Sequence, residues 1–177
     1  MCGIVGYVGK KQCTDILIGA LSKLEYRGYD SAGIAVFENN KIKVEKCQGK
    51  LENLINKIKE EGKPSGTCGI GHTRWATHGE PSDINSHPHG NKRVSIVHNG
   101  IIENYMKIKE FLIDQGYGFE SETDTEAVAK LRDYYYDGNP VDTIIKVLAE
   151  IEGSYALGIM FRDFPDRIFA VRKDSPL

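Results

Sequence analysis

One segment indicates the fold class, Ile34-Ala35-Val36-Phe37-Glu38-Asn39-Asn40-Lys41-Ile42-Lys43-Val44. Apolar residues alternate on both sides of its polar centre, which is the pattern of a β-hairpin. A second such pattern closes the chain, where residues 154–161 and 167–172 flank the turn Pro165-Asp166. Both patterns predict antiparallel sheet, because two strands joined by a tight turn run in opposite directions.

Helical patterns alternate with these hairpins along the chain. Apolar residues recur at helical spacing, and a Thr123/Glu126 capping pair and Asn139-Pro140 indicate two helix starts. We therefore expect helices near residues 16–24, 51–58, 105–112, 123–135 and 140–151, and further strands at 2–9, 68–73 and 93–98. Hairpins mixed with helices predict an α+β fold rather than a doubly wound α/β fold.

The composition is that of an ordinary globular domain of 177 residues, with 40% hydrophobic and 27% charged residues. The formal net charge of -2 argues against nucleic acid as a partner, since phosphate binding needs a basic surface. No apolar run approaches the roughly 20 residues that cross a bilayer, and no signal peptide is recognisable. We therefore expect a cytoplasmic protein with no membrane partner, whose four cysteines are free thiols.

Cys2 is the first residue that suggests chemistry. Removal of Met1 would place a free α-amine and a thiol on the same residue. Such an amine titrates near about 7.7–8.0 and can act as general base for its own side chain. The alternative is that Cys2 is a small apolar residue in an edge strand.

The pair Asn99-Gly100 also has two interpretations. Directly after a strand it is most typical of a hairpin turn. The functional alternative is an oxyanion hole, in which the Asn amide and a nearby backbone N–H point at one developing negative oxygen.

Charged and polar residues near the middle of the chain suit the two ends of an amino acid. Arg74, Thr77 and His78 offer a guanidinium, a hydroxyl and an imidazole, which together suit a carboxylate, although each is also a typical solvated loop residue. Asp124 suits an ammonium group, but an acid there is also what a helix N-terminus prefers.

All five histidines lie between His72 and His98, which raises the possibility of a metal-dependent hydrolase. The ligands would come from His72, His78, His87, His89, Glu80 and Asp83. No H-E-x-x-H spacing is present, however, and no cysteine joins the cluster. We expect no metal and no other cofactor.

Five motifs, taken in order, resemble the glutaminase domain of the glucosamine-6-phosphate synthase family, a class II (N-terminal-nucleophile) glutamine amidotransferase domain. They are Met1-Cys2-Gly3-Ile4-Val5-Gly6, Leu24-Glu25-Tyr26-Arg27-Gly28-Tyr29-Asp30-Ser31-Ala32-Gly33, Gly71-His72-Thr73-Arg74-Trp75-Ala76-Thr77-His78-Gly79, His98-Asn99-Gly100 and Ser121-Glu122-Thr123-Asp124-Thr125-Glu126. The related amidophosphoribosyltransferases share the N-terminal Cys, the His-Thr-Arg segment and the Asn-Gly pair. The resemblance covers essentially the whole chain.

The resemblance implies a four-layer αββα sandwich of two antiparallel sheets between helices, the N-terminal-nucleophile hydrolase fold. It implies hydrolysis of glutamine to glutamate and ammonia through a Cys2 thioester. Residues 1–177 would form the glutaminase domain. The family's sugar-phosphate isomerase region, which uses fructose 6-phosphate, is not in this sequence. We expect the isolated domain to be a monomer and the whole enzyme a homodimer.

The resemblance also assigns roles to individual residues. Cys2 would be the nucleophile, with Asn99 and Gly100 forming the oxyanion hole. Arg74, Thr77 and His78 would bind the glutamine α-carboxylate, and Asp124 would bind the α-ammonium together with the Gly100 carbonyl. Arg27 and His87 would be supporting residues, and Trp75 would be the gate of an ammonia channel.

Three alternatives remain open from the sequence. They are the glutaminase half of an amidophosphoribosyltransferase-like enzyme, a metal hydrolase built on the histidines, and an amino-acid sensor that binds glutamine without chemistry.

Overall fold

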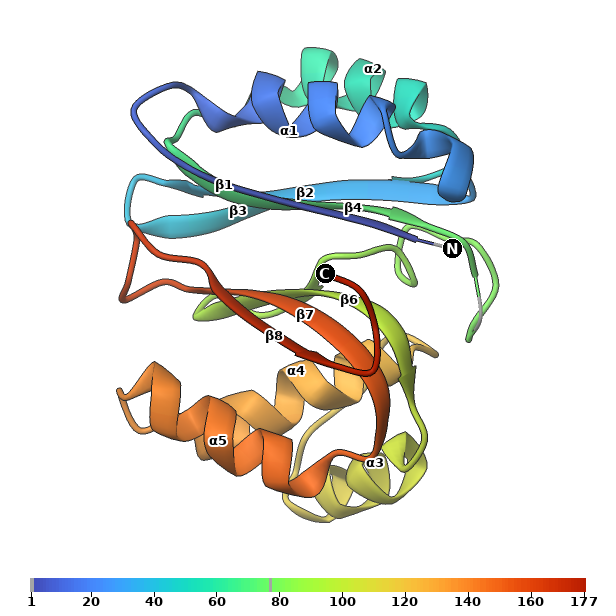
Figure 1. Cartoon of the computed structure of the whole chain (residues 1–177), viewed down its shortest axis with the longest axis vertical. Helices are drawn as coiled ribbons and strands as arrows, with labels where there is room; N and C mark the ends of the chain where they lie inside the picture. Colours follow the sequence, from blue (N-terminus) through green and yellow to red (C-terminus); the bar gives the residue numbers. More distant parts are fainter. Residues whose placement is uncertain (1, 77) are drawn as a thin grey trace.

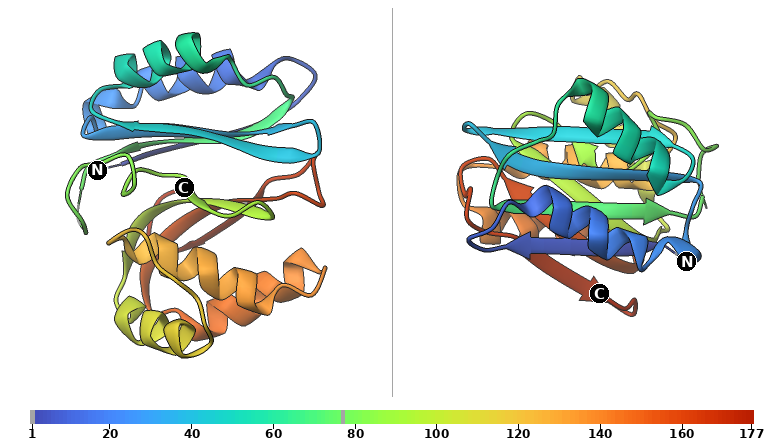
Figure 2. Two further views of the ribbon diagram at one scale, coloured as in Figure 1. Left: turned by 180° about the vertical axis from the view of Figure 1, so that it is seen from behind. Right: turned by 90° about the horizontal axis from the view of Figure 1, so that it is seen from above.

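A computed structural model describes residues 2–76 and 78–177, which form four layers (Figure 1). Two helices cover one sheet, a second sheet packs against the first, and three further helices lie on its outer side. Seen from above in Figure 2, α1 and α2 lie over the strands of the first sheet. The predicted α+β class and the αββα arrangement are confirmed.

The first sheet contains the predicted hairpin. Its strands are β1 (Gly3–Val8), β2 (Ser31–Glu38), β3 (Lys41–Gln48) and β4 (Cys68–Arg74), in the order β1-β4-β2-β3. All pairings are antiparallel. The turn between β2 and β3 is made by Asn39 and Asn40, whose φ angles of 50° and 60° suit the tight turn that matches strand twist. The first sheet therefore forms as the sequence predicts.

The second sheet has the order β5-β6-β7-β8, with β5 (His89–Gly90), β6 (Val94–Ile102), β7 (Gly153–Phe161) and β8 (Phe169–Lys173). Here the interpretation of Asn99-Gly100 as a turn is wrong. Strand β6 continues through both residues, which pair with Ala156 and Tyr155 of β7. Gly100 has a φ of 116°, and a Cβ there would come within 2.0 Å of the Ser154 carbonyl oxygen. The glycine therefore permits close strand pairing rather than a chain reversal.

The helices bury apolar residues on both outer sides of the sandwich. Helices α1 (Cys13–Ser22) and α2 (Leu51–Glu61) pack on the first sheet through Leu17, Leu21 and Leu54, each 0% exposed. The other three are α3 (Tyr105–Asp114), α4 (Asp124–Tyr135) and α5 (Pro140–Glu150), and a short 3-10 helix, η1 (Glu25–Arg27), follows α1. The sheets meet through a separate apolar cluster of Ala35, Cys68, Ile70, Val97 and Met160.

The start of α4 differs in detail from the predicted capping box. Thr123 Oγ1 accepts a hydrogen bond from Glu126 N at 3.3 Å, as expected for an N-cap. The Glu126 carboxylate, however, binds Ser121 N at 2.6 Å and Glu120 N at 3.0 Å instead of returning to Thr123. These bonds fix the segment that enters α4 and so position the adjacent Asp124.

Cys13, Cys47 and Cys68 are buried free thiols, as predicted, whereas Cys2 is partly exposed. No helix within residues 2–76 and 78–177 has the length and hydropathy needed to cross a bilayer.

Candidate active site

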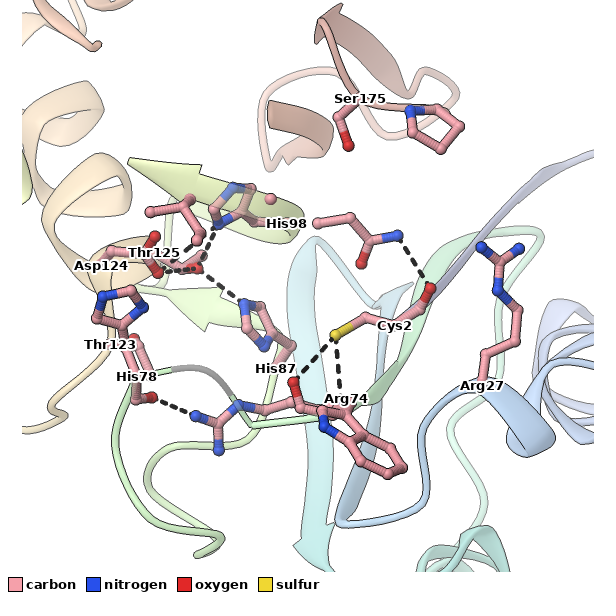
Figure 3. Close-up of a pocket in the computed structure, with 15 residues that line it drawn as sticks. Cys2, Arg27, Arg74, His78, His87, His98, Thr123, Asp124, Thr125 and Ser175 are labelled. Carbon is pink, nitrogen blue, oxygen red and sulfur yellow. Dashed lines mark hydrogen bonds and ion pairs between the residues drawn. The ribbon is translucent and has the colours of Figure 1, made fainter. Parts of the chain in front are cut away.

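A cavity of about 330 Å³ opens where β1 begins, β4 ends and α4 starts (Figure 3). Its wall comes from both sheets, from the start of α4 and from the end of the chain. The lining residues include nine of the site residues predicted from the sequence: Cys2, Arg27, Arg74, Trp75, His78, His87, Asn99, Gly100 and Asp124. Thr77 lies outside the residues that the structure describes.

Cys2 is held at the beginning of β1 by the last residues of β4. Its Sγ accepts a hydrogen bond from Trp75 N at 3.2 Å and lies 3.5 Å from Trp75 O. Burial raises the pKa of this thiol above its ordinary value, and the nearby Asp30 carboxylate adds to the effect. The thiol is therefore mostly protonated at neutral pH and needs a base to become a nucleophile.

The Asn99 carboxamide lies next to Cys2. Its Nδ2 donates to the Cys2 carbonyl oxygen at 3.2 Å, and its Oδ1 faces His72 Nε2 at 3.0 Å. Gly100 follows it in β6 and also lines the cavity. An amide N–H group, a flexible-backbone glycine and a thiol are thus within one pocket, the set that acyl-transfer chemistry requires.

The opposite end of the cavity carries charge. Figure 3 shows Asp124 on the side of the cavity away from Arg27, with Cys2 between them. Asp124 is 5% exposed, and its Oδ2 accepts a hydrogen bond from Ile102 N at 2.9 Å. The His98 Nδ1 is 3.8 Å from Asp124 Oδ1. A buried carboxylate with unused lone pairs is suited to an ammonium group.

Arg74 supplies the complementary charge. Its Nη2 donates to the carbonyl oxygen of His78 and, at 2.9 Å, to that of Gly79. Its Nη1 is buried and has no hydrogen-bond partner among the described residues. Because a buried guanidinium N–H without a partner is unfavourable, this group is available for an anion that enters the cavity.

The histidine cluster is a buried hydrogen-bonded network. His87 Nε2 and His98 Nδ1 each lie 2.9 Å from Thr125 Oγ1, and His89 Nε2 lies 3.1 Å from Thr123 Oγ1. The His72 and His87 rings pack 4.2 Å apart. These histidines thus bind protein hydroxyl groups and one another's rings.

Burial keeps these rings neutral. It lowers the pKa of His72 to about 3 and lowers the pKa values of His87 and His89 well below their ordinary range. Across residues 2–76 and 78–177, no group of three or more His, Cys, Asp or Glu side chains is arranged to hold a metal ion. The geometry does not favour the alternative of a metal hydrolase.

The supporting residues occupy distinct places. Arg27 reaches the cavity from η1, on the Cys2 side in Figure 3. Trp75 is 46% exposed, and its ring packs edge-on against Tyr29 at 5.3 Å. His87 lines the cavity, and its ring packs against the His72 ring.

Several lining residues were missed from the sequence, namely Thr123, Thr125, His98, Ile101, Ser175 and Pro176. Thr123 and Thr125 belong to a segment that is typical of a helix start. Because that role already accounts for them, nothing in the sequence indicates that they also line a cavity. His98 follows Val97 of the intersheet cluster on β6, and its ring contacts Thr125 of α4, a partner that no local pattern identifies. No local pattern identifies Ser175 or Pro176.

Comparison with known proteins places this geometry in a family. The sequence profile of the glutamine amidotransferase domain matches residues 72–175, more than half of the chain. The glutamine–fructose-6-phosphate aminotransferase (isomerizing) of Clostridium acetobutylicum is 61% identical over 100% of this chain, and that of Pyrococcus horikoshii is 47% identical over 100%. The chain spans 29% of the length of the first relative and 30% of the second.

A solved structure gives the same result for the fold. The B. subtilis glutamine phosphoribosylpyrophosphate amidotransferase superposes with a TM-score of 0.79 at 28% identity. The superposition covers 92% of this chain and 35% of that one. The predicted resemblance is thus confirmed in sequence and in fold, and the chain belongs to the glutamine amidotransferase domain family.

Proposed function

We propose that this chain hydrolyses L-glutamine to L-glutamate and ammonia, with Cys2 as the nucleophile. One arrangement carries the proposal: a single cavity holds a thiol beside an amide N–H donor, and a buried carboxylate and guanidinium farther in. The charged pair suits the α-ammonium and α-carboxylate of an amino acid. The thiol and amide suit its side-chain carbonyl.

The reaction proceeds in two half-reactions. Cys2 Sγ bonds to the amide carbon of glutamine, and the amide oxygen takes the negative charge, stabilised by Asn99 Nδ2 and the Gly100 N–H. Collapse breaks the C–N bond, and the nitrogen leaves as ammonia after gaining a proton. Water then attacks the thioester, the sulfur leaves, and glutamate is released.

The base in this scheme is the α-amine of Cys2, which becomes available when Met1 is removed. It takes the thiol proton before attack and returns a proton to the departing nitrogen. The raised pKa of the Cys2 thiol supports the need for such a base.

Substrate selection rests on the charged end of the cavity. Asp124 binds the α-ammonium together with the Gly100 carbonyl, and Arg74 binds the α-carboxylate through its unpaired Nη1. His78 completes this end, and Thr77 joins it on the basis of the family resemblance.

Three further residues act around the nucleophile. Arg27 supports the Cys2 side of the cavity, and His87 supports the wall through its ring contact with His72. Trp75 guards the exit for ammonia, which is supported by its half-exposed ring and by its backbone contacts with Cys2 Sγ.

In the whole protein, this domain supplies ammonia to a glutamine–fructose-6-phosphate aminotransferase that makes glucosamine 6-phosphate. Fructose 6-phosphate binds a sugar-phosphate region outside this sequence, and the whole enzyme is a cytoplasmic homodimer. Support comes from relatives up to 61% identical that carry this name, against 28% identity to the phosphoribosylpyrophosphate amidotransferase.

The test measures ammonia released from L-glutamine by the purified chain lacking Met1. Cys2→Ala is expected to abolish release, whereas Cys47→Ala, which removes a buried thiol outside the cavity lining, is expected to retain it. Undiminished release from Cys2→Ala would refute the proposal. Glutamine binding without any release by the unsubstituted chain would favour an amino-acid sensor.

A further inference from the structure

His72 lies directly behind the Asn99 carboxamide. It is on β4, 1% exposed, and opposite Ile4 of β1 and Gly33 of β2. Its Nε2 faces two oxygen atoms, the His98 carbonyl oxygen at 2.9 Å and Asn99 Oδ1 at 3.0 Å. Both can only accept, so the proton of the neutral ring must be on Nε2.

This proton determines which way the Asn99 amide points. On one side the carboxamide meets the imidazole N–H, which donates, and on the other the Cys2 carbonyl, which accepts at 3.2 Å. If the carboxamide turned end for end, its NH₂ would face the His72 N–H and its oxygen would face the Cys2 oxygen. Both contacts would then be repulsive, so only one orientation is satisfied.

The His72 ring is itself fixed in place. The His87 ring packs against it at 4.2 Å and is anchored by a 2.9 Å hydrogen bond between its Nε2 and Thr125 Oγ1. The chain near His87 lies close to β2, because a Cβ on Gly33 would come within 2.1 Å of the His87 carbonyl oxygen. Hydrogen bonding and packing therefore hold the donor on one side of Asn99.

We propose that His72 is a positioning residue for the oxyanion hole: its Nε2–H holds the Asn99 oxygen so that Nδ2 faces the reacting carbonyl. This inference rests on the proposed function, in which Asn99 donates to the oxyanion. His72 touches neither substrate nor the reacting atoms. It acts by excluding the orientation in which Asn99 would present an oxygen to a developing negative charge.

Two amide substitutions provide a matched test. Glutamine carries its side-chain nitrogen at about the reach of histidine Nε2, whereas asparagine ends near the reach of Nδ1. His72→Gln therefore keeps a donor facing Asn99, and His72→Asn loses it. We expect His72→Asn to lower kcat for glutamine hydrolysis by about 10- to 100-fold and His72→Gln to stay within about 5-fold of the unsubstituted chain.

Binding and coupling measurements separate positioning from general damage. In a Cys2→Ala background, calorimetry with L-glutamine should give dissociation constants within about 3-fold with and without His72→Asn, because the charged end of the cavity is intact. In an Asn99→Ala background, His72→Asn should change kcat by less than about 2-fold, since its partner is gone. Imidazole nitrogen NMR of the unsubstituted chain should find the His72 proton on Nε2.

The outcomes distinguish this inference from the proposed function. Absence of ammonia release by the unsubstituted chain would refute the proposed function itself. With release established, the inference is overturned by equal rates for His72→Asn and His72→Gln, by a full effect of His72→Asn without Asn99, or by a proton on Nδ1. The NMR result decides the matter even where a variant does not fold.

Discussion

Acidification should destabilise this domain strongly, because its buried histidines accept protons only after unfolding. His72, His87 and His89 are each at most 6% exposed, and burial lowers their pKa values, that of His72 to about 3. In the unfolded chain the same groups titrate near 6.5. A base with a lowered folded-state pKa contributes full stability above its unfolded-state pKa and loses it as the pH falls.

The magnitude follows from these values. Between about pH 7 and about pH 5, each histidine stabilises the unfolded chain by about 2 kcal/mol through proton uptake, so three give about 6 kcal/mol. His98 is left out of this sum, because Asp124 offsets part of the effect of burial on its pKa. A loss of about 6 kcal/mol is comparable with the whole stability of a typical domain, about 5–15 kcal/mol.

Urea unfolding followed by circular dichroism at a series of pH values measures this loss. The free energy of unfolding should fall by about 6 kcal/mol between about pH 7 and about pH 5. In His89→Gln this fall should be smaller by about 2 kcal/mol, since one proton-binding group is removed. A free energy of unfolding that stays constant over this pH range would refute the burial argument.

Three further results are expected. Asn99→Ala should lower kcat for glutamine hydrolysis by about 10²–10³-fold, because one donor to the oxyanion is lost. Asn99→Asp should lower kcat by about 10³-fold more, because a carboxylate about 4 Å from the oxyanion costs about 4 kcal/mol. Equal steady-state rates for the two variants would contradict this expectation. Gly33→Ala should lower the free energy of unfolding by more than about 3 kcal/mol, because its Cβ would meet the His87 oxygen at 2.1 Å. Gly19→Ala, with nothing within 4 Å, should instead raise it slightly, so equal effects in thermal melts would refute the close-approach argument. The hydrolysis rate should rise with pH between about 6 and about 8, because the α-amine of Cys2, which serves as the base, titrates at about 7.7–8.0; a flat profile of kcat/KM would count against that amine as the base.

Local chemistry explains why most of the fold is predictable from the sequence. Asn39 and Asn40 accept the positive φ angles of the β2–β3 turn, so the hairpin depends on neighbours in the sequence. Asn139 accepts hydrogen bonds from Val141 N and Asp142 N, which makes the start of α5 equally local. Elements stabilised by such short-range contacts are visible in a single sequence.

The errors and omissions concern features decided by distant partners. Asn99-Gly100 has the composition of a turn, but the neighbouring strand β7 extends past it and keeps both residues in the sheet. Strand β5 has only two residues, and its pairing with β6 gives no periodic pattern. Thr125 reaches two histidines on other elements, so its role emerges only when α4 packs against the second sheet.

For the site, individual residue types indicated candidate catalytic and binding residues. The family resemblance then predicted that these residues belong to one site. Cys2, Arg74 and Asp124 are far apart in the sequence, and no local spacing predicts that they line one cavity. The histidines were the most conspicuous group in the sequence. His78, His87 and His98 line the cavity, whereas His72 and His89 lie outside its lining.

The central claim, that Cys2 becomes covalently bonded to the glutamyl group of glutamine, is tested most directly by mass spectrometry. The chain lacking Met1 is mixed with L-glutamine, quenched in acid during turnover, and analysed as intact protein and as peptides. We predict a population heavier by one glutamyl group, located on Cys2, and none in Cys2→Ala or without glutamine. Ammonia release at the normal rate with no such adduct, or with the adduct on another residue, would contradict the account.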